Sequence, residues 1–460
     1  MTVKQIYTGC LAQGAYFIES NGEAAVIDPL REVSQYIGLA KESNTKIKYI
    51  FETHFHADFI SGHLTLAKRT GASIVYGPEA EPKFEAIIAK DNQVFKIGEV
   101  TITVIHSPGH TLESTSYLLK DKFGKQNCVF TGDTLFLGDV GIPDVAQRYK
   151  GVSKEELAGI LYDSLNNKIK PLSDDILVYP GHGAGSACGK NMMKETVDTL
   201  SNQKKINYSI NGTLSRDAFI YELTNDLPEP PAYFPSNVKL NFEGYLDFDI
   251  VLQKSLNPLN VKEFKSLSQN DEIVILDVRN QDLFSLGFIP GSIFVGLNGQ
   301  FAPWVGSVLK NIYTKILLVC ESGKETETIT RLSRIGFDNV LGYLDGGFNS
   351  WNESNEEIDF INTILPNNLS ELMNSEINLI DVRTNNEREN GFLKKSINIP
   401  LNIIDSKIGK LDKTKKYYVH CAGGYRSMIA CSILKRMGFD SLFDIKGGFA
   451  QIRKSELEIV

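Results

Sequence analysis

The sequence predicts an α/β protein made of several domains. Its 460 residues are more than one hydrophobic core usually organises, because domains hold roughly 150 residues each. Residues 273–292 and 377–396 also share one pattern, in which an apolar run precedes Asp-Val-Arg and a later Gly-Phe pair. In both copies, apolar runs rich in β-branched residues alternate with helical patterns, which favours parallel sheets. The runs that predict strands are 273–276, 315–319, 377–380 and 417–419.

The repeat predicts two similar domains after a different first domain at residues 1–240. We refer to residues 250–355 as the middle repeat and to residues 360–460 as the C-terminal repeat. Near the end of the first domain, residues 226–237 read DLPEPPAYFPSN. Prolines at this density cannot sustain a helix or a central strand, so we expect a linker there. The first domain has strand candidates of its own at 24–27, 48–51, 100–105, 128–130 and 176–179.

Composition and charge limit the classes of partner. The chain is 42% hydrophobic and 23% charged, which is ordinary for a globular protein. A net charge of -8 provides no general attraction for nucleic acid or anionic lipid. No apolar run is long enough to cross a membrane, and the six cysteines are too sparse for a disulfide framework. We therefore expect a cytoplasmic protein without nucleic acid or membrane partners, and the sequence leaves a homo-oligomer open.

Histidines concentrate in the first domain, in an arrangement typical of a metal site. Three of them, His54, His110 and His182, lie just beyond predicted strands, and so does Asp133. Strand ends that gather at one sheet edge would bring these imidazoles and the carboxylate together, and such side chains bind zinc or non-haem iron. The motifs that contain them are THFHADFISGH (53–63), HSPGHT (106–111), FTGDT (130–134) and PGHG (180–183).

Isolated histidines are more often surface or core residues than ligands. The clustering after strands argues against that interpretation for the set as a whole. His63 and His106 do fit it, because neither occupies a ligand position and the neighbouring glycines indicate turns.

The order of these motifs resembles the metallo-β-lactamase superfamily, whose fold is an αββα sandwich with metal at the edge of two packed sheets. Members that bind two metals use the motif THxHxDH. In this chain the last position is Phe59. The missing imidazole favours a single metal, although Asp58 and His182 remain for a second one.

A closer resemblance is to persulfide dioxygenases and to their rhodanese fusions, in which two histidines and one aspartate hold one ferrous iron. This resemblance implies that His54, His110 and Asp133 bind one Fe(II) per chain, with zinc as the alternative. Such a set of ligands leaves open positions for O2 and for a substrate sulfur. The residues that the resemblance places behind these ligands, to orient them or to bind water, are His56, Asp58 and His182.

Two further positions concern the substrate. Cys188 lies in GSACGKN (185–191), where related fusions also carry a cysteine, so the resemblance implies contact with the persulfide. A small buried apolar role is equally compatible with Cys188. The segment GDVGIPD (138–144) resembles a family loop that usually reads GRPD, and Ile142 stands where that arginine would be. Arg148 could compensate by binding a substrate carboxylate through paired hydrogen bonds.

The C-terminal repeat contains VHCAGGYRS (419–427), which places Cys421 between a strand and a helical pattern at 428–437. Backbone N–H groups of the glycine-rich turn and of the helix N-terminus stabilise a thiolate or persulfide, which makes Cys421 the expected nucleophile. Arg426 adds positive charge for sulfite or thiosulfate. Cys431, within the helical pattern, is expected in the core. The remaining loop residues, expected to bind substrate, are Ala422, Gly423, Gly424 and Tyr425.

This repeat resembles a rhodanese domain, and CAGGYR matches the six-residue active loop of sulfurtransferases. Asp-Val-Arg at 381–383, Glu387 and the INIP run at 397–400 match the flanking motifs. Related phosphatases have a longer loop, so hydrolysis of phosphate esters is disfavoured.

The middle repeat has a cysteine at the corresponding place, Cys320, within VCESGKETE. It lacks the paired glycines, and Glu321 and Glu325 should oppose both anion binding and thiolate formation. We therefore expect an inactive rhodanese-like domain with an architectural role. The alternative is that Cys320 is a second transfer cysteine.

Together these features favour a persulfide dioxygenase that oxidises a low-molecular-weight thiol persulfide with O2 to sulfite. Cys421 would transfer sulfane sulfur to sulfite, giving thiosulfate, or act in the reverse direction. One alternative is a zinc-dependent thioester hydrolase resembling glyoxalase II, fused to a sulfurtransferase. Another is a sulfur carrier or redox sensor that uses Cys421 and Cys188 without turnover.

Overall fold

The chain folds into two units. A computed structural model describes residues 1–144, 151–227, 229–374 and 377–460. The first unit consists of Met1–Val251, Lys310–Ile312 and Leu332–Gly336, and the second of Leu252–Leu309, Tyr313–Arg331 and Phe337–Val460. The domain boundaries expected from the sequence stay predictions.

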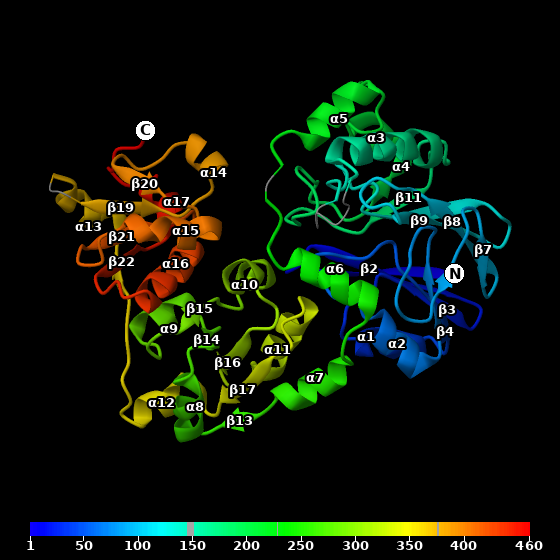
Figure 1. The fold of residues 1–460 in the computed structure, drawn as a ribbon. Helices are drawn as coiled ribbons and strands as arrows, with labels where there is room; N and C mark the ends of the chain where they lie inside the picture. The colour runs from blue at the N-terminus through cyan, green and yellow to red at the C-terminus, as the bar shows by residue number, and fades with distance from the viewer. Residues whose placement is uncertain (145–150, 228, 375–376) are drawn as a thin grey trace. The chain divides into compact units, whose positions relative to one another are not determined.

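Two six-stranded sheets form the centre of the first unit (Figure 1). The first sheet has the order β1-β2-β3-β4-β5-β6, with antiparallel pairs up to β3 and parallel pairs beyond it. Its strands are β1 (Thr2–Thr8), β2 (Gln13–Ser20), β3 (Glu23–Ile27), β4 (Lys46–Phe51), β5 (Ser73–Tyr76) and β6 (Ile87–Ile88). The second sheet has the order β12-β11-β10-β9-β8-β7, and its strands are β7 (Val94–Ile97), β8 (Val100–His106), β9 (Thr115–Lys120), β10 (Gln126–Gly132), β11 (Leu177–Pro180) and β12 (Asp198–Thr199).

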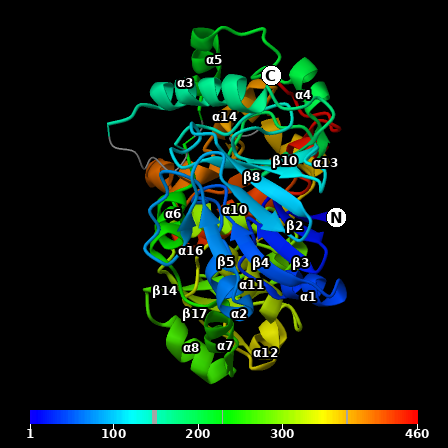
Figure 2. The same ribbon diagram turned by 90° about the vertical axis from the view of Figure 1, so that its right-hand side faces the viewer.

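Helices cover the outer faces of both sheets, which gives four layers (Figures 1 and 2). One hydrophobic core lies between the sheets and includes Ile27, Phe51 and Phe130, all fully buried. Another joins the second sheet to its helices and includes Val129 of β10 and Leu161 of α3. The predicted αββα sandwich is confirmed. The helices of this part of the chain are α1 (Ser34–Glu42), α2 (His63–Thr70), α3 (Lys154–Ser164), α4 (Leu200–Ile206), α5 (Arg216–Thr224), α6 (Phe234–Glu243) and α7 (Phe248–Ser255).

The strands predicted in the first domain are all present, within a few residues of the expected ends. Four of them, β4, β8, β10 and β11, are followed at once by the loops that carry the histidine and aspartate motifs. The sandwich therefore holds each of these loops at the end of a buried strand, which restricts how far its side chains can move.

The proline-rich segment differs from the expectation. Helix α6 begins at Phe234, inside the stretch 226–237 where no helix was expected. Pro235 lies in the first turn of this helix, where a backbone N–H would have no intrahelical acceptor and its absence costs little. The expected linker is therefore shorter than the proline spacing predicts, and residue 228 within it lies outside the described residues.

The second unit contains two five-stranded parallel sheets with the same topology, as the repeat predicts. The middle repeat has the order β13-β17-β16-β14-β15, and the C-terminal repeat has the order β18-β22-β21-β19-β20. The first set of strands is β13 (Pro258–Leu259), β14 (Ile273–Asp277), β15 (Ile293–Phe294), β16 (Lys315–Val319) and β17 (Val340–Leu344). The second set is β18 (Asn362–Ile364), β19 (Asn378–Asp381), β20 (Ser396–Asn398), β21 (Tyr417–His420) and β22 (Leu442–Ile445).

Helices flank these sheets, and one of them joins the two repeats. Helix α16 (Tyr425–Arg436) lies beside β15 of the middle repeat (Figure 1). The backbone N–H of Phe294 donates to Oγ of Ser432 at 3.0 Å, and both groups are buried. The other helices here are α8 (Val261–Ser268), α9 (Gln281–Leu286), α10 (Phe301–Leu309), α11 (Glu325–Arg334), α12 (Gly347–Glu353), α13 (Pro366–Ser370), α14 (Asn385–Glu389), α15 (Ile404–Lys407) and α17 (Gly448–Ile452).

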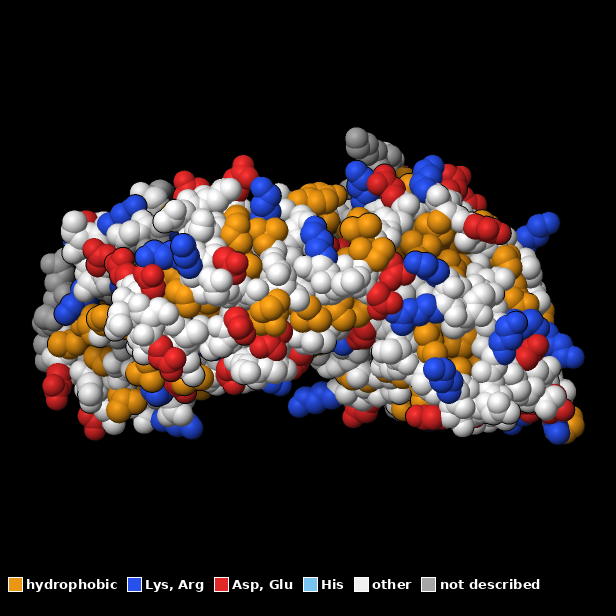
Figure 3. Space-filling view, turned by 90° about the horizontal axis from the view of Figure 1, so that it is seen from below, with side chains coloured by type: hydrophobic (Ala, Val, Ile, Leu, Met, Phe, Trp, Pro, Cys, Tyr) orange, Lys and Arg blue, Asp and Glu red, His pale blue; other side chains and the backbone are white. Residues whose placement is uncertain are grey.

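Acidic and basic side chains are interspersed with apolar ones on the face shown in Figure 3. Among the described helices, none combines the length and the apolar composition that a membrane crossing requires.

We expect replacement of His63 by phenylalanine to make the protein less sensitive to acid. His63 is fully buried, with the rings of Phe84 and Tyr245 at 4.9 and 5.5 Å, and burial lowers its pKa to about 3. Below pH 6.5 the unfolded chain binds a proton that the folded protein excludes, so stability falls as the pH drops toward 3. At pH 5 this proton binding lowers the free energy of unfolding by roughly 2 kcal/mol. The His63→Phe variant should not show that loss.

Thermal unfolding of metal-free protein at pH 7.5 and pH 5 measures this difference. The half-buried His106, changed to phenylalanine, is the control and should leave the loss unchanged. An equal loss of stability in wild type and His63→Phe would contradict the assignment.

Candidate metal centre and sulfur-transfer loop

His54, His110 and Asp133 come together at the ends of β4, β8 and β10. Each offers one ligand atom, and these three atoms all lie within 4.8 Å of one another. Oδ2 of Asp133 is 3.5 Å from Nε2 of His110 and 3.9 Å from Nε2 of His54. None of the three side chains is more than slightly exposed. The structure thus groups the residues predicted to be ligands, while their binding of a metal stays a prediction.

The outer nitrogens of both imidazoles have partners that set the tautomer. Nδ1 of His110 lies 2.6 Å from the carbonyl oxygen of Ile142, which can only accept, so Nδ1 donates. The Thr53 hydroxyl donates to Asp28 at 2.8 Å, which leaves its oxygen to accept from Nδ1 of His54 at 3.0 Å. Both Nε2 atoms therefore direct lone pairs toward Asp133, as metal-binding histidines do.

The charges and protonation states of His54, His110 and Asp133 are suited to a bound cation. Oδ2 of Asp133 is buried and has no hydrogen-bond partner among the described residues, although two imidazole lone pairs face it. Burial by itself would raise the pKa of Asp133, but the charge of His182 and its hydrogen bond to Asp133 hold that pKa well below its usual range. Burial lowers the pKa of both His54 and His110, so these rings stay neutral. Two neutral imidazoles and one carboxylate suit ferrous iron or zinc.

His182 lies between two carboxylates. Its Nδ1 is 2.8 Å from Oδ1 of Asp133, and its Nε2 is 2.8 Å from Oδ2 of Asp58. Burial would lower the pKa of His182, but Asp133 and Asp58 raise it well above its ordinary value. These contacts fix the orientation of Asp133 relative to His182, while the role of His182 behind the metal ligands stays a prediction.

His56 packs beside His54, with ring centroids 4.3 Å apart, and directs its Nε2 toward Asp28. Its Nε2 lies 3.1 Å from Oδ1 of Asp28 and 3.6 Å from Oε2 of Glu52, and its ring packs 4.3 Å from that of Phe59. Sequence reasoning missed both Asp28 and Thr53. The sequence pattern could have indicated Asp28, because this residue directly follows β3 in the same way that Asp133 directly follows β10.

Cys188 lies close to the same centre. Its sulfur groups with Asp58 and His182 within 4.8 Å, and the residue is 1% exposed. Burial, reinforced by the charges of Asp58 and Asp133, raises the pKa of its thiol well above the usual value. The Ile142 backbone N–H donates to the Cys188 carbonyl at 2.8 Å. The segment 138–144 therefore contacts the segment that carries Cys188 through its backbone. Arg148 lies outside the described residues.

Cys421 directly follows β21 at the opening of the glycine-rich loop. The residue is 1% exposed, and the Gly424 backbone N–H donates to its sulfur at 3.1 Å. Gly424 has φ +102°, a conformation that glycine adopts without strain, and α16 begins at the next residue. The N-terminus of α16 thus points its positive end toward the sulfur, which favours a thiolate or persulfide there.

Arg426 is tied to a carboxylate. Its two terminal nitrogens donate to Glu387 at 2.6 and 2.5 Å. Burial would raise the pKa of Glu387, but this pair lowers it to about 2. The sequence placed Glu387 only in a flanking motif, and no spacing rule would have revealed this pairing.

The other loop residues contribute in different ways. The Tyr425 hydroxyl donates to the Gly296 carbonyl of the middle repeat at 2.6 Å. The Ala422 carbonyl accepts from the Ala450 backbone at 2.9 Å, and Gly423 faces open space. Their roles in substrate binding stay predictions.

Cys320 of the middle repeat has a different environment. Burial, followed by the charges of Glu325, Asp277 and Glu321, raises its pKa to about 12. Its thiol is therefore protonated at neutral pH, which opposes a nucleophilic role. Cys431 is fully buried in α16, as expected of a core residue.

Two family descriptions match this chain. Residues 8–182 match the metallo-beta-lactamase superfamily, and residues 260–354 and 365–455 each match the rhodanese-like domain.

Comparison with individual proteins gives relatives of two kinds. The human mitochondrial persulfide dioxygenase ETHE1 is 30% identical over 215 residues, which cover 45% of this chain and 74% of the relative. The probable hydroxyacylglutathione hydrolase glo2 of Schizosaccharomyces pombe is 32% identical over 162 residues, 34% of this chain. The chain spans only 58% of that hydrolase. A crystal structure of a metallo-beta-lactamase from Staphylococcus aureus is 30% identical, with TM-score 0.65, and covers 75% of this chain and 98% of its own.

We expect Thr53→Val to weaken metal retention. The substitution removes the hydroxyl that links Asp28 to Nδ1 of His54, so the ring is no longer held with Nε2 toward Asp133. Loss of such an outer partner typically lowers metal affinity by about 10–100-fold. Metal content after competition with a graded series of chelator concentrations measures this change.

The matched control is Thr65→Val. The Thr65 hydroxyl is buried in α2 and has no hydrogen-bond partner among the described residues. Equal metal retention by the two variants would show that the Asp28–Thr53 link does not orient His54.

Proposed function

Because the chain belongs to the metallo-β-lactamase superfamily and carries two rhodanese-like domains, we propose that it is a persulfide dioxygenase coupled to sulfur transfer. The first unit oxidises a low-molecular-weight thiol persulfide with O2. Cys421 in the second unit carries sulfane sulfur. The observation that supports this proposal most directly is the group formed by His54, His110 and Asp133. It combines two neutral imidazoles with a carboxylate oxygen that has no hydrogen-bond partner among the residues that the structure describes.

The proposed reaction is RSSH + O2 + H2O → RSH + SO3²⁻ + 2H⁺. The terminal sulfur loses four electrons, which reduce the two oxygen atoms of O2. Ferrous iron, when bound, supplies redox chemistry and open coordination positions for O2 and the persulfide. His54, His110 and Asp133 would hold it.

The surrounding residues keep this centre oriented. His182 contacts Asp133 through one ring nitrogen and Asp58 through the other, so a second ion at His182 would have to replace its contact with Asp58. Phe59 removes a further imidazole from that position. Both features favour a single metal ion, in keeping with the one Fe(II) per chain that the resemblance implies.

The second candidate is a zinc-dependent thioester hydrolase. The hydroxyacylglutathione hydrolases among the relatives favour it, because similar ligands can activate water for acyl cleavage. Hydrolysis and oxygenation differ in metal and in co-substrate. Metal identity and O2 uptake therefore discriminate between the two candidates.

We expect anaerobically purified protein to hold about one ferrous iron per chain and to consume O2 when given glutathione persulfide. His110→Ala should lose the iron and the O2 uptake together, since the centre would keep only one imidazole. The matched control is His106→Ala, four residues earlier, whose ring hydrogen-bonds to the Leu112 carbonyl. It should retain both properties. An oxygen electrode and elemental analysis provide the measurements.

Tightly bound zinc, thioester hydrolysis and no O2 uptake with any thiol persulfide would favour the hydrolase. Stoichiometric loading of sulfur on Cys421 without sustained product would instead indicate a carrier or sensor.

The Cys421 loop gives the product sulfite a reaction partner. Sulfite attacks the outer sulfur of a Cys421 persulfide, the S–S bond breaks, and the thiolate leaves with its electron pair. Gly424 and the N-terminus of α16 stabilise that thiolate. The product is thiosulfate, and the reverse reaction uses the same groups.

We expect Cys421→Ser to retain O2 uptake but to release sulfite without thiosulfate, because serine cannot carry sulfane sulfur. The matched control, Cys320→Ser, changes the corresponding cysteine of the middle repeat and should leave both products unchanged. Ion chromatography of sulfite and thiosulfate measures the outcome. Unchanged thiosulfate formation by Cys421→Ser would refute the role of this cysteine.

A further inference from the structure

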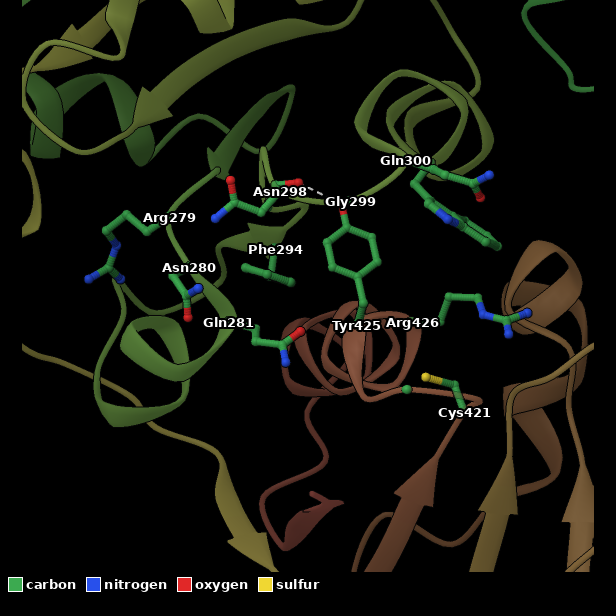
Figure 4. Close-up of a pocket in the computed structure, with 13 residues that line it drawn as sticks. Arg279, Asn280, Gln281, Phe294, Asn298, Gly299, Gln300, Cys421, Tyr425 and Arg426 are labelled. Carbon is green, nitrogen blue, oxygen red and sulfur yellow. Dashed lines mark hydrogen bonds between the residues drawn. The ribbon is translucent and has the colours of Figure 1, made fainter. Parts of the chain in front are cut away.

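A cavity of about 370 Å³ opens beside Cys421 in the second unit. Figure 4 shows that its walls come from both repeats, with Cys421, Tyr425 and Arg426 on one side. Gln281, Asn298 and Gln300 of the middle repeat line the other side. Cavities of this size, roughly 300–1,000 Å³, hold organic ligands, and one sulfur oxyanion would leave most of the space empty.

The two cations that line this cavity are already neutralised. Arg426 donates both terminal nitrogens to Glu387, and Arg279 donates to Asp277 at 2.6 and 3.0 Å. A dianion such as thiosulfate would therefore meet no unpaired cationic side chain among the residues that line the cavity. The charge pattern does not favour thiosulfate as the preferred sulfur donor.

The middle repeat instead offers amide and aromatic groups. The side chains of Gln281, Asn298 and Gln300 form no hydrogen bonds with other residues in the described part of the chain, so their donors and acceptors are available. Nε2 of Gln281 reaches the active loop, 3.6 Å from where a Cβ on Gly424 would lie. Trp304 adds an apolar surface. Side-chain amides pair well with the amides of a peptide-like ligand, because both carry a donor and an acceptor.

Close contacts fix the position of one wall of the cavity relative to the other. The Tyr425 hydroxyl donates to the Gly296 carbonyl, and a Cβ on Gly299 would lie only 2.4 Å from the Tyr425 ring. The middle repeat therefore approaches the active loop closely and presents its amides in fixed positions.

We propose that the middle repeat makes Cys421 selective for persulfides of amide-bearing thiols over thiosulfate as sulfur donor. Gln281, Gln300 and Trp304 are the specificity-determining residues. The inference rests on the proposed sulfur-transfer role of Cys421. The Cys421 thiolate attacks the outer sulfur of RSSH, a new S–S bond forms, and the old S–S bond breaks. The outer sulfur keeps its hydrogen, and RS⁻ leaves with the electron pair.

Loading of Cys421 under anaerobic conditions tests this proposal in the full-length protein, because the dioxygenase reaction cannot run without O2. The donors are glutathione persulfide and thiosulfate, supplied separately. Mass spectrometry of the tryptic peptide 417–426, which contains Cys421 as its single cysteine, measures the rate at which it gains one sulfur atom.

Wild type should load faster from glutathione persulfide. Gln281→Ala and Gln300→Ala should each slow that loading by roughly three- to tenfold, as expected for one lost hydrogen bond, and change loading from thiosulfate by less than about twofold. Trp304→Ala should slow glutathione persulfide loading selectively as well. Gln269→Ala, an exposed glutamine of the same repeat outside the cavity, is the matched control and should leave both rates unchanged.

Equal effects on both donors, or no effect on either, would overturn the selectivity, as would faster loading of wild type from thiosulfate. Failure of Cys421 to load from either donor would overturn the sulfur-transfer role together with the selectivity. The rate of O2 uptake, measured separately in air, reports the first unit. A selectivity failure with intact O2 uptake and intact Cys421 loading therefore leaves the proposed function standing.

Discussion

One buried carboxylate organises the first unit. Asp133 accepts from His182 through one oxygen, while its other oxygen faces two neutral imidazoles and has no hydrogen-bond partner in the described part of the chain. A buried anion of this kind is costly unless surrounding groups compensate it. The loops after β4, β8 and β11 bring His54, His110 and His182 to the loop after β10 that carries Asp133, and His182 supplies the hydrogen bond. The sandwich can therefore be understood as a scaffold that brings strand ends to Asp133.

The sequence predicts the groups that lie at strand ends and fails for those that depend on tertiary distance. His54, His110 and Asp133 were recognisable because each follows a readable apolar run. The link from Asp28 through Thr53 to His54 joins β3 to the loop after β4, and no local pattern specifies such a contact. The Arg426–Glu387 pair escapes prediction for the same reason.

Helix α6 illustrates a second kind of failure. Proline density predicts a break, but the effect of a proline depends on its position in the helix. Pro235 lies in the first turn, where it is tolerated, so the segment becomes helical from Phe234 onward. The repeats, in contrast, were predictable as two similar domains with parallel sheets, because the same apolar runs recur in both copies.

The raised pKa of Cys320 and the paired cations of the cavity bear on the order of steps in the proposed reaction. Because the Cys320 thiol keeps its proton at neutral pH, the proposal gives the middle repeat the role of a cavity wall and not of a second nucleophile. Because Arg426 pairs with Glu387, its charge is largely balanced beside Cys421. In the proposed reaction, sulfite would therefore enter by attack on a sulfur that is already loaded. An organic persulfide that fills the cavity would donate its sulfur and leave as the thiol before sulfite approaches. The two proposed half-reactions would then use one cavity in sequence, and the amide wall would act only on the first.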